Sequence, residues 1–258
     1  MIKFFQKIRQ KQVETGKVKN YLLYAIGEIV LVVIGILIAL QINNWNEEYK
    51  DSQLEQSYYC KLLEDVNQDH VLLTQLMKDN QERIVWVNKG IHLLQQEKVN
   101  RKEVVQAMQK SINKIRFNFK PSLSAFDDLK SSGKLNIIKD LSIKKKLLNY
   151  YAVQAGYGDI QDIVADASLD AYLNPSKDFE EVGFQDIDFV KDEIDIAIVN
   201  LEKLKPRSFP SLQIRKQLLT EIILHLNTNA RKKNVYKTME KEVLDLKEVL
   251  EKKCASKE

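Results

Sequence analysis

The chain has 258 residues, of which 29% are charged, and its formal net charge is +4. Residues 1–20 contain six basic residues and one acidic residue, and the next 25 residues add only Glu28, so residues 46–258 hold 34 of each sign. A formally neutral domain with no evident basic patch argues against nucleic-acid binding. About 213 residues follow the first 45, which is enough for one domain with its own core.

Residues 1–20 form a basic segment in which Ile2, Phe5 and Ile8 share one helical face. This pattern is typical of a short helix that lies on the cytoplasmic surface of a membrane. A positive tail without fixed structure, which only sets the topology, explains the composition equally well. Both interpretations place residues 1–20 in the cytoplasm.

Residues 21–45 are predicted to form a transmembrane helix in a lipid bilayer. Thirteen Leu, Ile and Val residues lie between Leu22 and Leu40, and each favours insertion by roughly 0.3 to 0.6 kcal/mol. One carboxyl group costs about 3 kcal/mol, so the balance favours insertion despite Glu28. Tyr21, Tyr24 and Trp45 are predicted to anchor the helix at the two membrane interfaces.

The flanking charges predict the orientation of this helix. Six basic residues precede it, whereas the 20 residues after Trp45 contain only Lys50 and Lys61 among six acidic residues. Positive flanks stay in the cytoplasm, so residues 46–258 are predicted to be periplasmic, in the inner membrane of a bacterium. The apolar run exceeds a typical signal-peptide core, and no small-x-small cleavage motif follows it, which indicates a retained signal anchor.

Glu28, Gly35 and Ala39 lie seven and four residues apart and therefore share one helical face. Gly35-x-x-x-Ala39 is a small-xxx-small pattern, which lets two membrane helices approach closely. We expect this face to contact another helix, in a homo-oligomer or another membrane protein, with Glu28 protonated or hydrogen-bonded inside the contact. A carboxyl group hydrated near the membrane boundary and a proton- or ion-conducting role remain alternatives.

The rest of the chain is predicted to be helical. Apolar residues at spacings of three and four predict a first helix that ends near Gln96. Further helices are predicted over 101–116, from Ser124 to Leu129 with a capping arrangement of Ser124 and Asp127, over 142–155, from a break at Gly156 and Gly158 to Leu173, and over 187–204. The last helix carries a near-heptad seam of Leu212, Leu219, Leu226, Met239, Val243, Leu246 and Leu250.

No segment has a persuasive strand pattern. The predicted fold is therefore all-α, with a single N-terminal transmembrane helix followed by an extramembrane antiparallel helical bundle. In this arrangement the first and last long helices pair antiparallel. The predicted domains are the basic segment 1–20, the transmembrane helix 21–45 and the periplasmic helical domain 46–258.

Two stretches resemble one uncharacterised family. The run YLLYAIGEIVLVVIGILIALQINNWNE, preceded by MIKFFQKIRQK, resembles single-pass membrane proteins that share a domain of unknown function and are common in Bacteroidota. The stretch LKSSGKLNIIKDLSIKKKLLNYY, Leu129 to Tyr151, is also similar to that family. The resemblance implies the inner membrane of a Gram-negative bacterium and implies no activity.

Cys60 and Cys254 are the two cysteines, near opposite ends of residues 46–258. If the first helix leaves the membrane and the last returns to it, both cysteines lie at the membrane-proximal end. A disulfide could then form in an oxidising periplasm. Two unrelated thiols are the favoured alternative, because Cys254 lies in a polar tail that is expected to fray.

Asp159, Asp162, Asp166 and Asp170 recur at spacings of three and four on one predicted helix. Aligned carboxylates could collect a divalent cation, which prefers oxygen ligands. Ligands from a single helix face do not converge on one point, so a solvated face is the favoured interpretation. The histidines His70, His92 and His225 are scattered and match no metal-binding motif.

No phosphate-binding loop, dinucleotide fingerprint or nucleophile elbow occurs, so no catalytic residue, cofactor or metal is assigned. The sequence therefore favours a membrane-tethered helical binding module, a scaffold or sensor, which self-associates and is not an enzyme. One alternative is an accessory subunit of a membrane transport or envelope complex. An enzyme with a site within residues 120–190 is the weaker alternative.

Overall fold

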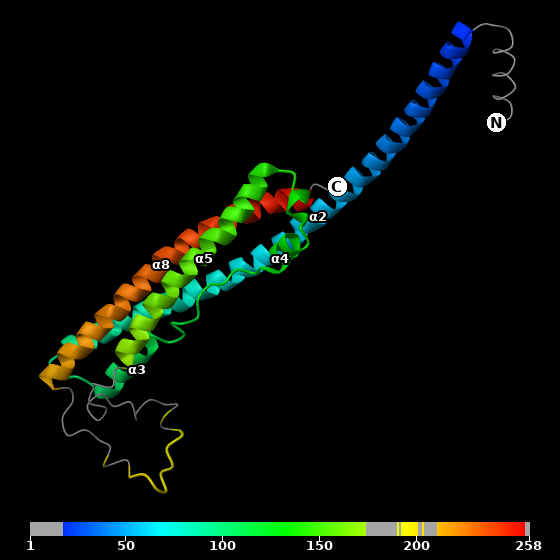
Figure 1. Cartoon of the computed structure of the whole chain (residues 1–258). Helices are drawn as coiled ribbons and strands as arrows, with labels where there is room; N and C mark the ends of the chain where they lie inside the picture. Colours follow the sequence, from blue (N-terminus) through cyan, green and yellow to red (C-terminus); the bar gives the residue numbers. More distant parts are fainter. Residues whose placement is uncertain (1–17, 174–189, 191, 201–202, 204–210, 256–258) are drawn as a thin grey trace. The chain divides into compact units, whose positions relative to one another are not determined.

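A computed structural model describes residues 18–173, 190, 192–200, 203 and 211–255 of the chain. Within these ranges every regular element is helical, which confirms the all-α prediction. The elements are α2 (Val18–Gln95), α3 (Arg101–Ser111), α4 (Ser124–Ser131), the 3-10 helix η1 (Lys134–Ile137), α5 (Leu141–Tyr172) and α8 (Leu212–Ala255) (Figure 1). The chain divides into unit 1, residues 1–56, and unit 2, residues 57–258.

In unit 1, α2 exposes apolar side chains on all of its faces. The exposed fractions of the large apolar residues from Leu22 to Ile42 run from 47% at Val33 to 73% at Leu31. By length and composition this helix can cross a membrane. The basic segment 1–17 and the side chain of Tyr21 lie outside the described residues.

In unit 2, the buried side of α2 is a regular heptad seam. Its positions alternate at spacings of three and four, which keeps them on one stripe, and are occupied by Tyr59, Leu62, Val66, Asp69, Leu73, Leu76, Asn80, Arg83, Val87, Gly90 and Leu94. The apolar periodicity predicted this helix and its end at Gln95. It did not predict that Asp69, Asn80 and Arg83 would be buried in the same seam.

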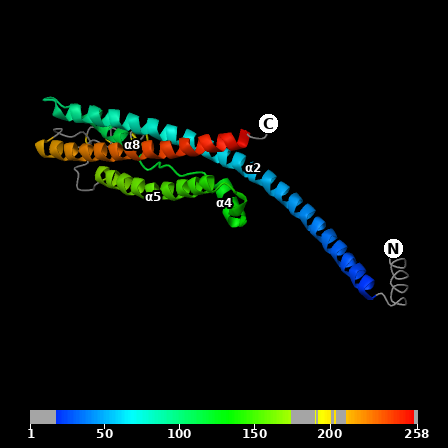
Figure 2. The ribbon, with the colours of Figure 1, turned by 90° about the horizontal axis from the view of Figure 1, so that it is seen from above.

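Within unit 2, α8 runs antiparallel to α2. Cys60 is bonded to Cys254, the Arg83 side chain to Asn229, and the Arg215 side chain to the backbone of Gln96. The 36 residues from Cys60 to Gln96 on α2 are matched by 39 residues from Cys254 back to Arg215 on α8, so the antiparallel register is nearly constant over the whole pairing. Two orthogonal views show the helices side by side (Figures 1 and 2).

The predicted seam of α8 is correct in its second half and wrong in its first. Met239, Val243, Leu246 and Leu250 are buried as predicted. In the first half the structure buries Ile214, Leu218, Ile222 and His225, whereas Leu212 is 70% exposed. From Leu218 to Leu250 the true seam keeps one unbroken heptad spacing and passes through the polar residues His225, Asn229 and Lys232, so a pattern of leucines alone misplaces it.

The predicted break at Gly156 and Gly158 is wrong, because α5 is continuous from Leu141 to Tyr172. Each glycine costs a helix about 1 kcal/mol relative to alanine. Burial of Leu147, Tyr150 and Ala165 along the same helix outweighs that cost. Both glycines face open space, where an added methyl group would meet no atom within 4 Å.

Two short segments also differ from the prediction. The second helix ends at Ser111 rather than near Arg116, and Lys114 adopts a left-handed φ of 55°. Helix α4 has no side-chain cap from its own N-terminus, so Ser124 does not act as predicted. Asp65 on α2 accepts the backbone N–H of Ala125 at 2.7 Å instead.

Of the helix predicted over 187–204, Val190 is helical and Lys203 lies in a 3-10 turn, but residues 192–200 form turns and irregular backbone, so the predicted helix is not continuous. Asp195 accepts the backbone N–H of Ala197 at 2.9 Å, and this local bond competes with helical hydrogen bonds. Most of the other residues in the predicted range lie outside the described part of the chain.

Candidate functional site

Arg83 is the centre of a buried polar network at the middle of unit 2. Its Nε donates to Oδ1 of Asn229 at 2.7 Å, and its Nη2 donates to Oδ1 of Asn80 at 3.1 Å. Its Nη1 donates to the backbone oxygen of Asn113 at 3.2 Å. Burial lowers the pKa of the guanidinium, which still remains charged at neutral pH. The network fixes the pairing of α2 with α8, since a slip of the register would leave a buried charge without acceptors.

Lys232 adds a second buried cation on α8. It is 0% exposed, and its Nζ donates to the backbone oxygen of Ile115 and to Oδ1 of Asn118. Asn118 in turn donates to Asp162 on α5. Burial lowers the pKa of Lys232 to about 7, and the charge of Arg83 acts in the same direction. An amine closed off from solvent cannot reach a substrate, so its role is structural.

Ser111, His225 and Glu221 form a serine–histidine–carboxylate array that only the fold brings together. Ser111 Oγ lies 2.7 Å from His225 Nδ1, and His225 Nε2 lies 3.8 Å from Oε1 of Glu221. Ser111 Oγ donates to the backbone oxygen of Met108 at 2.6 Å, so Nδ1 is the donor to Oγ. In a catalytic array the histidine instead accepts the proton of the serine hydroxyl. Because Ser111 and His225 are fully buried, we assign the array to packing.

A third polar cluster joins α2 to α5 and to the segment before α4. Asp69 accepts the hydroxyl of Tyr150 at 2.6 Å and the backbone N–H of Ser122 at 2.7 Å. Burial raises the pKa of Asp69 to about 6, although both hydrogen bonds act to lower it. Tyr151 donates to the backbone oxygen of Ser122 and stacks on Phe126, with ring centroids 4.1 Å apart. The cluster holds α4 against α2 and α5.

A pocket of about 200 Å³ opens beside Arg83. Its lining is predominantly charged, with the side chains of Asp79, Glu82, Arg83, Trp86, Lys110, Asn113 and Lys114. Lys110 Nζ lies 4.3 Å from the ring centre of Trp86, and Lys114 pairs with Asp79 at 3.7 Å. Pockets that enclose small organic ligands usually measure about 300 to 1,000 Å³. The lining residues include no serine, cysteine or histidine, and the pocket is smaller than this range.

In unit 1 the predicted contact face is open within one chain. Gly35 and Ala39 are exposed, and a methyl group added at Gly35 would meet no atom within 4 Å. Glu28 and the anchor residue Tyr24 are half-buried, and Trp45 is exposed. A second helix therefore has room to approach this face. The contact itself stays a prediction.

A disulfide joins Cys60 on α2 to Cys254 on α8. Their Cα atoms lie 5.1 Å apart, and both residues are half-buried. The polar tail that was expected to fray is helical up to Ala255, which brings Cys254 to Cys60. A cross-link over so long a loop stabilises the folded chain by about 2 to 5 kcal/mol.

The four aspartates of α5 do not converge on one point. Asp162 accepts from Asn118, and Oδ1 of Asp166 lies 3.2 Å from Nη2 of Arg116. Asp159 and Asp170 are exposed further along the helix. In the described part of the chain, no group of three or more His, Cys, Asp or Glu side chains is arranged to hold a metal ion.

The residues that sequence reasoning missed are the polar members of the seams, above all Asn80, Arg83, Asn229 and Lys232. A signal for the first two was available. Leu76 and Val87 are apolar positions of this helix, and heptad spacing between them falls on Asn80 and Arg83. Polar residues at such positions are typical of register-setting contacts.

Comparison with known proteins finds one family. A family described as a family of unknown function, DUF6090, matches residues 28–164, which is slightly more than half of the chain. The match covers most of the apolar helix and the whole Leu129 to Tyr151 stretch. No curated protein and no solved structure matches the chain.

We predict that Lys232 makes the stability of unit 2 depend on pH. The folded-state pKa of about 7 lies below the ordinary value of a lysine, so between pH 7 and pH 10 the unfolded chain binds more protons than the folded chain. The free energy of unfolding therefore rises with pH in that window, by about 4 kcal/mol, and the cost is fully present below pH 7. Unfolding in detergent, followed by circular dichroism, measures this rise.

Lys232→Met removes the titrating group and should flatten the rise. The matched control is Lys237→Met, which replaces an exposed lysine on the same helix and should leave the slope unchanged. An equal slope in Lys232→Met and the natural chain would show that Lys232 titrates at its ordinary pKa.

Proposed function

This chain belongs to the family of unknown function DUF6090, and we propose that it is a membrane-tethered helical binding module. The observation that carries the proposal is the exposure of apolar side chains on every face of α2 between Leu22 and Ile42. Such a surface is unfavourable in water, by about 25 cal/mol for each Å². A helix that is apolar all round is stable inside a bilayer, where its backbone hydrogen bonds are satisfied internally.

The proposed setting is the inner membrane of a Gram-negative bacterium, with the N-terminus in the cytoplasm and unit 2 in the periplasm. The excess of Lys and Arg before the apolar helix supports this orientation. The pairing of Cys60 with Cys254 supports it independently, since structural disulfides persist in the periplasm and are rare in the cytoplasm.

Unit 2 is proposed to act as an antiparallel helical bundle built on the α2–α8 seam. The antiparallel register from Cys60 to Gln96 and the packing of α5 on α8 support this architecture. Two features support binding rather than catalysis as its role. The titratable groups at its centre are closed off from solvent, and the lining of the pocket beside Arg83 holds no serine, cysteine or histidine.

Self-association through Glu28, Gly35 and Ala39 is the proposed mode of partner binding. The open space beside Gly35 supports it, because two helices with small residues at the contact approach closely enough to pack backbone against backbone. An accessory subunit of a larger membrane complex would use the same face to contact a different protein.

The compartment of unit 2 is tested with its cysteines in intact cells. The natural chain should resist a thiol reagent until it is reduced. Cys60→Ser frees Cys254, which should react with a membrane-impermeant maleimide in spheroplasts without permeabilisation. Loss of the disulfide should also lower the free energy of unfolding by about 2 to 5 kcal/mol.

Gln10→Cys in the basic segment is the control and should react only after permeabilisation. Labelling of Cys254 that needs permeabilisation would reverse the proposed topology. Labelling of the natural chain without a reductant would show that the disulfide is absent.

Self-association is tested by energy transfer between donor- and acceptor-labelled chains in proteoliposomes. Gly35→Leu holds the two backbones apart and should weaken association by about tenfold, equivalent to roughly 1.4 kcal/mol. Glu28→Gln should weaken it if the carboxyl group donates or accepts across the contact. Val33→Leu on the opposite face is the matched control. Unchanged transfer in both Gly35→Leu and Glu28→Gln would exclude this contact.

A further inference from the structure

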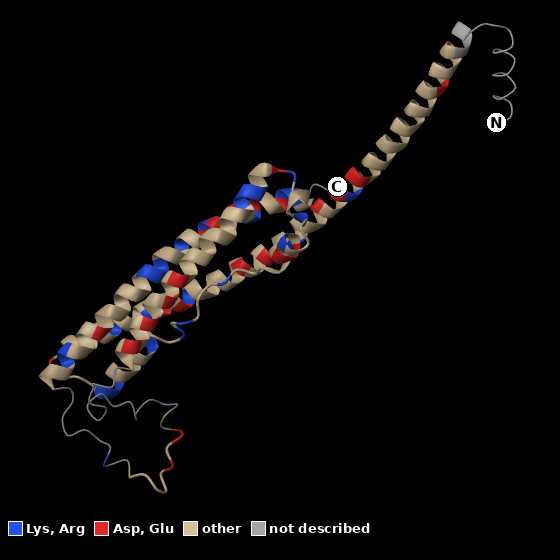
Figure 3. Cartoon of the chain, viewed as in Figure 1, with Lys and Arg blue, Asp and Glu red and all other residues tan. Residues whose placement is uncertain are grey.

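A lysine-rich segment lies at one end of unit 2. Residues 130–148 contain six lysines and a single acidic residue, Asp140, although residues 46–258 as a whole are formally neutral. Figure 3 shows the blue of Lys and Arg residues on the ribbon near the start of α5. We name residues 130–148 the basic end; its lysines are Lys130, Lys134, Lys139, Lys144, Lys145 and Lys146.

Three contacts within unit 2 place the basic end beside Ser57, where the unit begins. The hydroxyl of Tyr58 donates to Asp128 at 2.9 Å, immediately before the basic end. Lys253 pairs with Asp140 at 3.3 Å, one residue from the cysteine that is bonded to Cys60. The basic end is therefore the end of unit 2 that the chain joins to the apolar helix.

The basic end also exposes leucines. Leu141, Lys145 and Leu148 lie four and three residues apart on one face of α5, and the two leucines are 78% and 42% exposed. Single exposed leucines are common on protein surfaces. Leucines that alternate with lysines on one helical face are typical of surfaces that lie in the headgroup region of a membrane.

We propose that the basic end binds anionic phospholipid headgroups of the membrane in which the chain is anchored. The inference rests on the proposed membrane anchor. Lys139 and Lys145 would contact headgroup phosphates, and Leu141 would enter the boundary between headgroups and acyl chains. The basic end would thereby hold unit 2 against the bilayer.

Two physical arguments favour a lipid surface over another acidic partner. Unit 2 begins twelve residues after Trp45, and these residues belong to α2, so at 1.5 Å per residue they separate this end from Trp45 by about 18 Å. An anchored chain therefore always carries this end near a bilayer surface, where even weak contacts form. Each exposed lysine strengthens binding to an anionic surface by about fivefold.

The test places the photoreactive residue p-benzoylphenylalanine at one position of the full chain and measures its adducts with lipid. Leu141 is the test position. Leu212, which is 70% exposed at the start of α8, is the matched control in unit 2. Ile34 is the control for the anchor. The chain is reconstituted in vesicles of phosphatidylcholine alone or with about one third phosphatidylglycerol.

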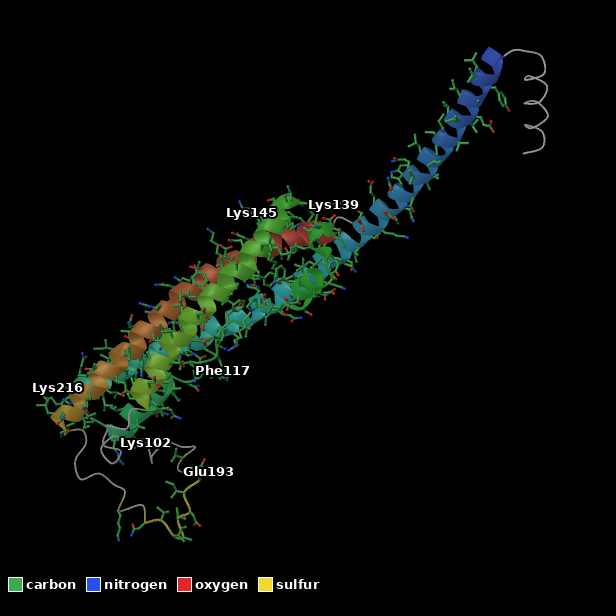
Figure 4. All side chains as sticks on the ribbon, viewed as in Figure 1. Lys102, Phe117, Lys139, Lys145, Glu193 and Lys216 are labelled. Carbon is green, nitrogen blue, oxygen red and sulfur yellow. A yellow bond between two sulfur atoms is a disulfide. The ribbon has the colours of Figure 1, made fainter. Side chains whose placement is uncertain are left out.

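We expect lipid adducts at Leu141 to exceed those at Leu212 by at least about fivefold in the anionic vesicles, and to fall toward the Leu212 level in neutral vesicles. The double variant Lys139→Glu, Lys145→Glu should abolish this excess. Lys102→Glu, Lys216→Glu should not, because these lysines lie at the other end of unit 2 (Figure 4). High salt should also remove the excess, since it screens the lysine charges within a few ångströms.

Adducts at Ile34 test the membrane anchor separately from the lipid-binding surface. If Ile34 forms lipid adducts but Leu141 forms no more than Leu212, the basic end does not bind lipid and the anchor stands. The same conclusion follows if reversing the charge of Lys139 and Lys145 has no effect, or if Leu141 is cross-linked to a protein instead. If Ile34 forms no lipid adducts, the anchor and the lipid-binding surface both fail.

Discussion

The constraint on which this structure depends is the cost of leaving the apolar side chains of residues 22–42 in water. No polar face relieves that cost, because the side chains of this part of α2 are apolar in every direction except at Glu28 and Gln41. Insertion into a bilayer removes this cost and also accounts for features elsewhere in the chain. The charge asymmetry across the helix, the cysteine pair and the lysines of the basic end are all consistent with one membrane, one sidedness and one attached domain.

Unit 2 illustrates how a helical pair combines a strong apolar interface with a costly polar centre. The two long seams are apolar toward the disulfide and polar around Arg83, Asn229 and Lys232. Buried charges of this kind add little net stability, but they penalise every alternative register, since a slip would leave a cation without acceptors. The apolar contacts therefore stabilise the pairing of α2 with α8, and the polar contacts exclude its other registers.

Periodicity predicted the elements better than it predicted their contacts. The apolar spacing along α2 and the second half of α8 depends on one helix at a time, so the sequence contains that information in full. The register of α8 before Tyr236 depends on polar residues that become buried only because Arg83 and Asn80 lie opposite them. The same reason explains why α5 continues through Gly156 and Gly158, since packing against other helices overrides local propensity.

The candidate sites likewise divide into those that a local pattern predicts and those that only the fold brings together. Cys60 and Cys254 were recognised as a possible pair, yet only the antiparallel register of α2 and α8 brings them to bonding distance. The array of Ser111, His225 and Glu221 has no sequence motif, and its burial, not its composition, assigns it to packing. Glu28, Gly35 and Ala39 could be identified from sequence alone because a shared helical face is a local property.

Alkaline carbonate extraction of membranes that contain the full chain is the most direct test of whether α2 is an integral membrane helix. An integral helix resists this treatment, whereas a protein held by surface charge or by another protein is released. We expect the natural chain to stay in the pellet and a variant with Leu31, Ile34 and Leu37 all replaced by Asp to be released. Recovery of the natural chain in the supernatant would contradict the anchor.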